Sequence, residues 1–317
     1  MSKILTVFGA TGNQGGSVIR AILADPSLSR EFCIRGVTRD ASKPAARALA
    51  ALPGVELVEA DLSSPAPAVA GAHTVFLVTN FWESMSADVE VAQGRAVADA
   101  SRDAGVKHLV FSSLINTTRA SGGRLSHISH FDGKARIEEY MREQSSGSGG
   151  VPVTAVLPGF FMSNLLTQIR KGEDGAYTWT LPEGLSADNG KLPLLDVADD
   201  MGKFVKAAIK NFPASAGKHI YAATDYYSPQ RILSELASTC GGPSAASAAR
   251  IQHVPQDVFK SFLNPGVAQE MLENMLLLED PGYYAGADLS ESLALLGEED
   301  KPTTWADFVA RNRDRWA

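Results

Sequence analysis

The chain has 317 residues, of which 44% are hydrophobic, and it carries a formal net charge of −7. This length and apolar content provide for a large core, in one large domain or one domain with a smaller appendage, and they exclude a disordered or fibrous chain. The acidic balance argues against direct binding of nucleic acid through a basic face, and the two cysteines are too few for a disulfide framework or a metal site.

The first element is a short apolar run over residues 4–8, followed by Gly9-Ala10-Thr11-Gly12-Asn13-Gln14-Gly15-Gly16. The run predicts a buried strand, and apolar residues at helical spacing follow the glycines, so the glycines form a turn from strand to helix. Such a turn fits a dinucleotide: Gly9 permits the bend, Gly12 lets the backbone approach a pyrophosphate, and Gly15 lets the helix pack closely on the strand. The alternative is a structural glycine turn of another α/β protein.

The second predicted strand, residues 32–38, ends at the position where such proteins choose their cofactor. It runs into Thr38-Arg39-Asp40, with Lys43 close behind. Arg39 and Lys43 could grip the 2′-phosphate of NADP, whereas Asp40 could bind the ribose hydroxyls of NAD. We expect NADP(H) as the preferred cofactor and NAD(H) as the alternative, and a solvated Arg–Asp surface pair is the remaining interpretation.

The third and fourth predicted strands, residues 55–60 and 74–79, also end in candidate ligand-binding residues. Asp61 follows the third strand, where a short acid commonly lies over the adenine; a helix N-cap is its alternative role. Phe81 and Trp82 follow the fourth strand and could wall the nicotinamide pocket, since ligands bind beyond the carboxyl ends of parallel strands. Simple packing is the alternative for both aromatic residues.

The next segments complete the alternation of strands and helices. A helix over about 86–104 is followed by a strand at 106–111, a long polar loop at 115–130, a helix opening at 131 and a Ser–Gly connector at 145–150. We expect the loop to be a lid or binding loop and the connector to be mobile. With a sixth strand at 153–157, the pattern predicts an α/β Rossmann fold with a doubly wound parallel sheet.

These motifs resemble the NmrA-like branch of the atypical short-chain dehydrogenases/reductases. The resemblance rests on the glycine turn, on Val37-Thr38-Arg39-Asp40 and Asp61, and on His130-Phe131-Asp132-Gly133-Lys134, Leu157-Pro158-Gly159-Phe160-Phe161 and residues 193–200. It implies an NAD(P)-binding Rossmann domain over residues 1–157 and a smaller α/β substrate or partner subdomain over 158–317. Residues from about 191 to 210 are expected to return to the Rossmann part.

Active members of the wider superfamily place a tyrosine four residues before a lysine, with a serine on the preceding strand. Here Lys134 matches the lysine, His130 stands in place of the tyrosine, and Ser112 or Ser113 stands at the serine. Histidine can move protons near neutral pH, so His130 is a candidate catalytic residue; capping a helix or lining the pocket is its alternative role. Lys134 is expected to donate to the ribose hydroxyls and to assist catalysis.

The residues expected to contact the cofactor lie in the glycine turn, at the strand ends or on the helix after the polar loop. They are Gly9, Thr11, Gly12, Asn13, Gln14, Gly15, Arg39, Lys43, Asp61, Leu62, Thr79, Asn80, Phe81, Ser112, Lys134, Pro158 and Phe160. Farther along, a strand is predicted at 177–180 and helices at 198–209, 229–238, 255–262, 265–278 and 303–313. In the extended reductases such elements close over the nicotinamide.

Two functions remain open. The resemblance and the missing tyrosine favour a nucleotide-sensing, redox-responsive regulator that binds NADP(H) and acts through a protein partner such as a transcription factor. The alternative is an NAD(P)H-dependent oxidoreductase acting on a small carbonyl, enone or quinone. No secretory leader and no run of roughly twenty apolar residues is evident, so we expect no membrane association and a cytoplasmic protein, with the nucleus as a further location.

Overall fold

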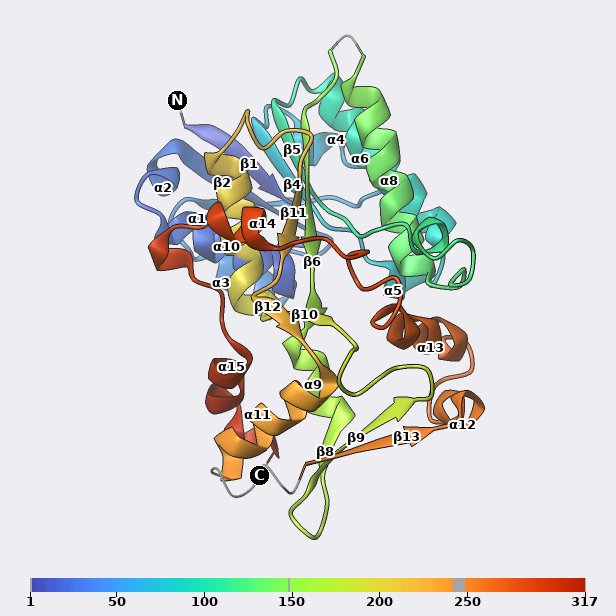
Figure 1. Ribbon diagram of the computed structural model, residues 1–317. Helices are drawn as coiled ribbons and strands as arrows, with labels where there is room; N and C mark the ends of the chain where they lie inside the picture. The colour runs from blue at the N-terminus through green and yellow to red at the C-terminus, as the bar shows by residue number, and fades with distance from the viewer. Residues whose placement is uncertain (1, 148, 242–248, 317) are drawn as a thin grey trace.

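The computed structural model describes residues 2–147, 149–241 and 249–316 (Figure 1). Its centre is a seven-stranded parallel sheet with the order β11-β6-β5-β4-β1-β2-β3. The strands are β1 (Lys3–Val7), β2 (Phe32–Thr38), β3 (Val55–Glu59), β4 (Thr74–Leu77), β5 (His108–Ser112), β6 (Val153–Pro158) and β11 (His219–Ala222). The predicted doubly wound α/β class is confirmed, because the strand order reverses direction at β1 and β4.

Helices cover both faces of this sheet, as Figure 1 shows. Helices α1 (Asn13–Ala24) and α10 (Val197–Lys210) share one apolar cluster with the strands, and α6 (Ala87–Asp103) and α8 (Ser129–Ser145) share the cluster on the other face. Strand β4 illustrates the alternation: Phe76 packs in the first cluster, whereas Val75 and Leu77 pack in the second. Both faces of the central strands β4, β5 and β6 are therefore buried, which explains their nearly continuous apolar runs in the sequence.

Helix α10 lies directly against α1, although 185 residues separate the two in the chain at their contact. The backbone N–H of Gly202 donates to the Ser17 hydroxyl over 2.9 Å. A Cβ atom on Gly202 would lie 2.2 Å from the Ser17 carbonyl oxygen, so only glycine permits this approach. The helix that follows the glycine turn is thus braced by a late segment of the chain.

Short helices lie in the connections between the strands of the first part of the chain, and one of them, α7 (Thr117–Ala120), lies in the segment 115–130 that was predicted as a polar loop. The others are α2 (Leu28–Glu31), α3 (Pro44–Ala50), α4 (Ala66–Val69) and α5 (Phe81–Ser84). Because α8 begins at Ser129, His130 lies in a first helical turn and not in the preceding loop. Residue 148 of the Ser–Gly connector lies outside the described residues. Strand β11 was not predicted, since it is only four residues long.

The rest of the chain forms two three-stranded sheets and several helices around a separate apolar cluster. The strands are β7 (Phe160–Phe161), β8 (Ile169–Lys171), β9 (Tyr177–Pro182), β10 (Leu192–Leu195), β12 (Asp225–Tyr227) and β13 (Ala249–Val254). The helices are α9 (Met162–Gln168), α11 (Pro229–Gly241), α12 (Gln256–Ser261), α13 (Ala268–Leu277), α14 (Ser290–Ala294), α15 (Trp305–Arg311) and the 3-10 turns Glu298–Asp300 and Arg313–Trp316.

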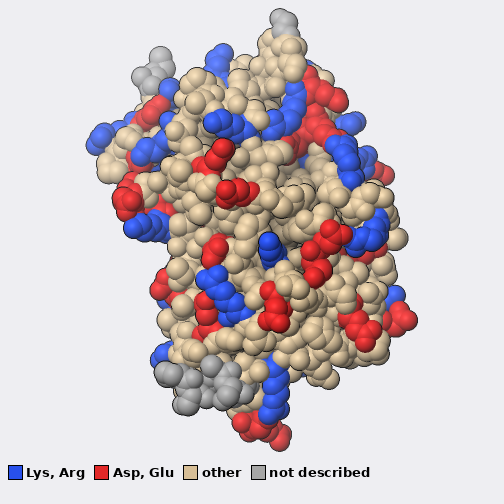
Figure 2. Space-filling view, viewed as in Figure 1, with Lys and Arg blue, Asp and Glu red and all other residues tan. Residues whose placement is uncertain are grey.

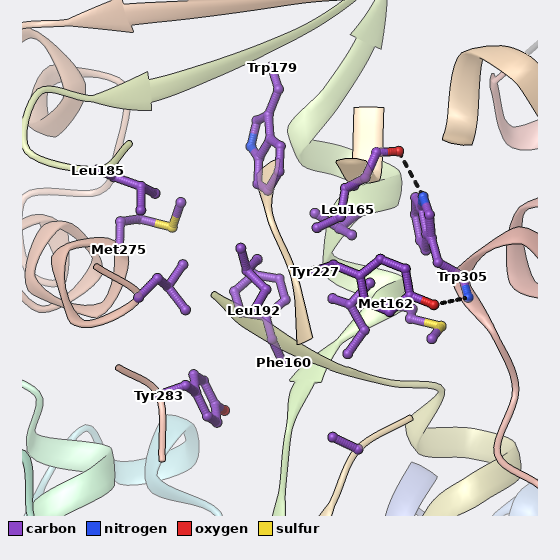
Figure 3. Packing of buried hydrophobic residues seen from close by; sticks show 14 of the residues in the cluster. Phe160, Met162, Leu165, Trp179, Leu185, Leu192, Tyr227, Met275, Tyr283 and Trp305 are labelled. Atoms are coloured by element: carbon purple, nitrogen blue, oxygen red, sulfur yellow. Dashed lines mark hydrogen bonds between the residues drawn. The ribbon is translucent and has the colours of Figure 1, made fainter. Parts of the chain in front are cut away.

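Two buried tryptophans anchor this second cluster (Figure 3). Trp179 lies on β9, and Trp305 begins α15 near the end of the chain. The Trp305 indole donates to the Ile232 carbonyl oxygen over 2.8 Å, and its backbone N–H donates to the Tyr227 hydroxyl over 3.4 Å. The buried Trp305 ring and its two hydrogen bonds thus hold α15 against β12 and α11.

Candidate functional site

A cleft of about 1500 Å³ opens beyond the carboxyl ends of the parallel strands, with the second half of the chain as its opposite wall. All but one of the residues predicted to contact the cofactor line it, together with His130. They are Gly9, Thr11, Gly12, Asn13, Gln14, Gly15, Arg39, Lys43, Asp61, Leu62, Thr79, Asn80, Phe81, Lys134, Pro158 and Phe160.

Ser112 is the exception. It is fully buried in β5, opposite Val156 of β6, and it does not line the cleft. Its hydroxyl oxygen has no hydrogen-bond partner among the described residues. Ser112 thus lies apart from the other expected contact residues, and its contact with the cofactor stays a prediction.

The glycine turn forms a cradle at the N-terminus of α1. Gly9 has φ +66°, which favours glycine, and a Cβ atom on Gly15 would lie 2.2 Å from the Gly9 carbonyl oxygen. No side chain caps the helix and no acidic residue lies in its first turn. The free N–H groups of that turn and the positive end of the helix dipole fit a diphosphate, the group expected here.

Arg39 lies at the end of the cleft where the adenosine of a dinucleotide would be bound. Its guanidinium forms an ion pair with Glu83 of α5, and both side chains are more than half exposed. Lys43 lines the same end of the cleft. An exposed pair of this kind contributes little stability, so Arg39 can exchange Glu83 for a phosphate group.

The two acids at this end are engaged by the backbone next to them. The Asp40 carboxylate accepts hydrogen bonds from the Ser42 hydroxyl and N–H group over 2.6 and 2.8 Å, and these bonds hold the pKa of Asp40 below its usual value. Asp61 accepts from the Ser63 N–H group over 2.8 Å while it lines the cleft. Asp40 thus stabilises a turn, while it lines the cleft together with Arg39 and Lys43.

Lys134 belongs to a buried polar network that the sequence did not predict. Its ammonium group pairs with Glu90 of α6, whose side chain is fully buried, and the same carboxylate oxygen accepts from the Thr79 hydroxyl over 2.6 Å. A Cβ atom on Gly133 would lie 2.9 Å from the other oxygen of Glu90. The glycine before the lysine therefore makes room for the carboxylate that holds Lys134.

His130 lies one helical turn before Lys134 and also lines the cleft. Its ring packs among three aromatic rings, at centroid distances of 6.0 Å from Phe81, 4.9 Å from Trp82 and 4.9 Å from Phe131. Phe81 is buried, whereas Trp82 is 45% exposed at the rim. His130, Lys134 and Phe81 thus line the same cleft as the glycine cradle.

The wall opposite the strands comes from the second half of the chain, where the sequence predicted a strand at 177–180 and helices at 255–262 and 265–278. Phe160, Phe161 and Trp179 reach the cleft from β7 and β9, and the remaining apolar lining comes from α12, α13 and the chain after each: Phe259, Phe262, Leu263, Met271, Met275 and Tyr283. Tyr283 packs edge-on against Phe131 at 5.1 Å, and burial raises the pKa of its phenol well above the usual value. It is therefore a neutral phenol at the cleft.

On the face drawn in Figure 2, acidic and basic side chains are interspersed, with no broad basic area among the described residues. Within the described part of the chain, no three His, Cys, Asp or Glu side chains are placed to hold a metal ion. No described helix is both long and apolar enough to cross a membrane.

Residues 1–309 match the NmrA-like family. The oxidoreductase ptmS of Penicillium ochrochloron, a protein with an NmrA-like family domain, is 35% identical over 221 residues, which are 64% of this chain and 63% of that protein. The chain thus spans less than two-thirds of that relative.

Two solved structures share the fold. The negative transcriptional regulator NmrA in complex with NAD has a TM-score of 0.76 and 21% identity, covering 98% of this chain and 94% of that one. The NADPH-dependent quinone oxidoreductase QOR2 of Escherichia coli, complexed with NADPH, has a TM-score of 0.73 and 20% identity, covering 97% and 99%.

Proposed function

Because the chain belongs to the NmrA-like family, we propose that it binds NADP(H) in the cleft and reduces an apolar, unsaturated carbonyl compound such as a quinone or an enone. One observation carries the proposal: a single cleft contains the glycine cradle, Lys134 and His130, and it continues into an aromatic half. The names of ptmS, an oxidoreductase, and of QOR2, an NADPH-dependent quinone oxidoreductase, support it.

The cofactor would be held by groups along the whole strand edge. The first-turn N–H groups of α1 would bind the diphosphate, Arg39 and Lys43 the 2′-phosphate, and Asp61 with Leu62 the adenine. Lys134 would donate to the nicotinamide ribose. When bound, the cofactor supplies the hydride.

Lys134 and His130 have separate tasks in this proposal. An ammonium group has three donors, and the pair with Glu90 uses one of them, so Lys134 can hold the ribose without leaving the network. His130 lies in the cleft and can donate a proton to the carbonyl oxygen of the substrate, the task of the missing tyrosine. Glu90 keeps the ammonium in place because a fully buried carboxylate requires a partner.

The cleft lining indicates the substrate class. The half opposite the strands contains aromatic and thioether side chains, among them Trp179, Phe262 and Met271, beside polar side chains such as Arg170 and Asn274. Flat unsaturated rings pack well on such surfaces, through offset or edge-on contacts and through sulfur–aromatic contacts. A quinone or a cyclic enone therefore fits this half better than a small hydrophilic aldehyde.

Calorimetric titration with NADP⁺, NADPH, NAD⁺ and NADH tests the binding step, and we expect the two phosphorylated forms to bind more tightly. NADPH oxidation is then followed with a naphthoquinone, a cyclohexenone and an aldehyde. The variant H130Q should lose about 10²- to 10⁴-fold in turnover while its NADPH affinity is kept. The variant Y283F is the matched control, because it removes the other proton donor of the cleft. Absence of nucleotide binding would refute the proposal, and full activity of H130Q with loss in Y283F would move the donor to Tyr283.

A nucleotide-sensing regulator is the second candidate, supported by the tyrosine missing at position 130 and by the fold shared with NmrA. In this case the nucleotide would change the affinity for a transcription factor or another protein, in the cytoplasm or the nucleus. A pull-down of a protein partner whose yield depends on NADP⁺ or NADPH, together with reduction of none of the three substrates, would favour the regulator over the enzyme.

A further inference from the structure

Helix α13 meets the start of α8 through two His–Glu pairs of the same construction. Glu270 accepts from the backbone N–H of His130 over 3.0 Å, and its Oε1 lies 2.5 Å from His130 Nδ1. Glu273 accepts from the backbone N–H of His127 over 2.8 Å, and its Oε1 lies 2.5 Å from His127 Nδ1. Both glutamates are buried and come from the same face of one helix.

The two pairs differ in what surrounds the imidazole. The His130 side chain is 13% exposed and lines the cleft, whereas the His127 side chain is 61% exposed and does not line it. Hydrogen bonds from Gln269 and His127 outweigh the effect of burial and hold the pKa of Glu273 below its usual value. The outer pair therefore joins α13 to α8, while the inner pair does so inside the cleft.

The inner pair decides which nitrogen of His130 carries an exchangeable proton. An ionised carboxylate only accepts hydrogen bonds, so Nδ1 must hold a proton toward Glu270. The other ring nitrogen, Nε2, does not contact Glu270; in the neutral ring it accepts a long hydrogen bond of 3.4 Å from the side-chain amide of Asn274, another residue lining the cleft, and a substrate oxygen can replace this weak contact. The surrounding aromatic rings limit rotation of the imidazole, so this arrangement is retained.

We propose that Glu270 is the positioning residue of His130: it fixes the Nδ1–H tautomer and stabilises the protonated ring, so that Nε2 gives the proton to the substrate. This rests on the reductase function proposed above. The Nε2–H bond breaks as the carbonyl oxygen gains the proton, while the hydride from NADPH supplies the two electrons that reduce the substrate and NADP⁺ is left. His130 is then neutral, with its remaining proton on Nδ1 and hydrogen-bonded to Glu270, and water returns a proton to Nε2.

The outer pair supplies a matched control for this proposal. Glu270→Gln and Glu273→Gln each keep an oxygen that can accept the backbone N–H and each remove one charge from α13. A purely structural role predicts similar consequences for the two variants. A positioning role predicts that only Glu270→Gln changes the chemistry.

Two measurements are made on the full chain: NADPH oxidation with the naphthoquinone, and ¹⁵N NMR of the histidine rings, with His130 assigned by comparison with H130Q. We expect Glu270→Gln to lower kcat by about tenfold or more, with NADPH affinity within about twofold, and Glu273→Gln to leave kcat within about twofold. The Nδ1 resonance of His130 should be that of a protonated nitrogen in the wild type and shift in Glu270→Gln alone.

Other outcomes separate this proposal from the proposed function. If the wild type oxidises NADPH and H130Q does not, but Glu270→Gln matches the wild type in kcat and in its His130 resonances, the positioning role is wrong. Equal losses in both glutamine variants, together with equal losses of melting temperature, would also overturn it. If the wild type oxidises NADPH with none of the substrates, the reductase proposal fails, and an unprotonated Nδ1 in the wild-type spectrum would reject the positioning role independently.

Discussion

The two halves of the cleft are built in different ways. The half expected to hold the dinucleotide is formed by backbone groups and strand ends within the first part of the chain, and the glycine cradle occupies only residues 9–15. The opposite half collects side chains from β7, β9, α12 and α13, which lie far apart in the sequence. In the first half, each expected binding group therefore lies close in the sequence to the strand end that positions it. The second half brings together side chains from distant segments of the chain.

Lys134→Met tests whether the dinucleotide half depends on the buried ion pair between α8 and α6. It should have the largest effect on stability of the variants considered. Removal of the ammonium leaves Glu90 as an uncompensated charge in a fully buried position, which costs about 3–5 kcal/mol in the free energy of unfolding. Chemical denaturation measures this loss. The double variant Glu90→Gln/Lys134→Met removes the charge and should recover part of the stability. If the single and double variants are equally unstable, the pair does not couple α6 to α8.

Gly15→Ala tests whether the backbone of the glycine turn forms the dinucleotide half of the cleft. The new Cβ atom would lie 2.2 Å from the Gly9 carbonyl oxygen, so the turn and the helix must separate, at a cost of about 1–3 kcal/mol or more. NADPH affinity should fall sharply, as measured by calorimetry. Gly12→Ala is the comparison: its Cβ would lie 3.3 Å from the same oxygen, so its cost in stability should be smaller, although its methyl group would also approach the expected pyrophosphate. Unchanged affinity in Gly15→Ala would place the diphosphate elsewhere.

Arg39→Ala asks whether a side chain, and not the backbone, decides cofactor choice in the dinucleotide half. We expect a loss of about 1.5–3 kcal/mol in NADP(H) binding and little change for NAD(H), because a charged hydrogen bond to the 2′-phosphate is lost. Glu83→Gln is the matched control: it releases Arg39 from its exposed pair and should slightly strengthen NADP(H) binding. Equal losses for both cofactors in Arg39→Ala would show that this guanidinium does not contact the phosphate.

Phe262→Ala tests the opposite half, with the smallest expected effect. The side chain is 65% exposed at the edge of the cleft, so the free energy of unfolding should change by less than about 0.5 kcal/mol. KM for the naphthoquinone should rise about threefold to tenfold while NADPH affinity stays the same, since one wall of the apolar half is lost. A change in NADPH affinity instead would mean that the two halves are not separate.

The sequence predicted the dinucleotide half because its signals are short-range. Glycine spacing, apolar strands and the residues that follow them lie within a few positions of one another, and they identified sixteen of the cleft-lining residues. Ser112 is the one expected contact residue that does not line the cleft, because which residues at the end of a strand face the cleft cannot be derived from residue type. Glu90 was missed, although an acid on the buried stripe of α6 beside Val91, Gly94 and Val97 was a signal for a paired charge.

The opposite half could not be predicted, because nothing local marks which side chains meet. The helix near 265–278 was expected, but its register against α8 arises only from tertiary packing. The pairing of Glu270 with His130 joins positions 140 residues apart. Edge strands such as β8 and β12, three residues each, are also too short to give a periodic signal.

The contact between Gly202 and Ser17 can form only late in the synthesis of the protein. The amino-terminal helix of the cradle rests on a partner encoded much later, so the growing chain cannot complete that support until α10 has left the ribosome. The glycine turn, although among the first parts of the chain to emerge, therefore gains this support only after translation has passed α10.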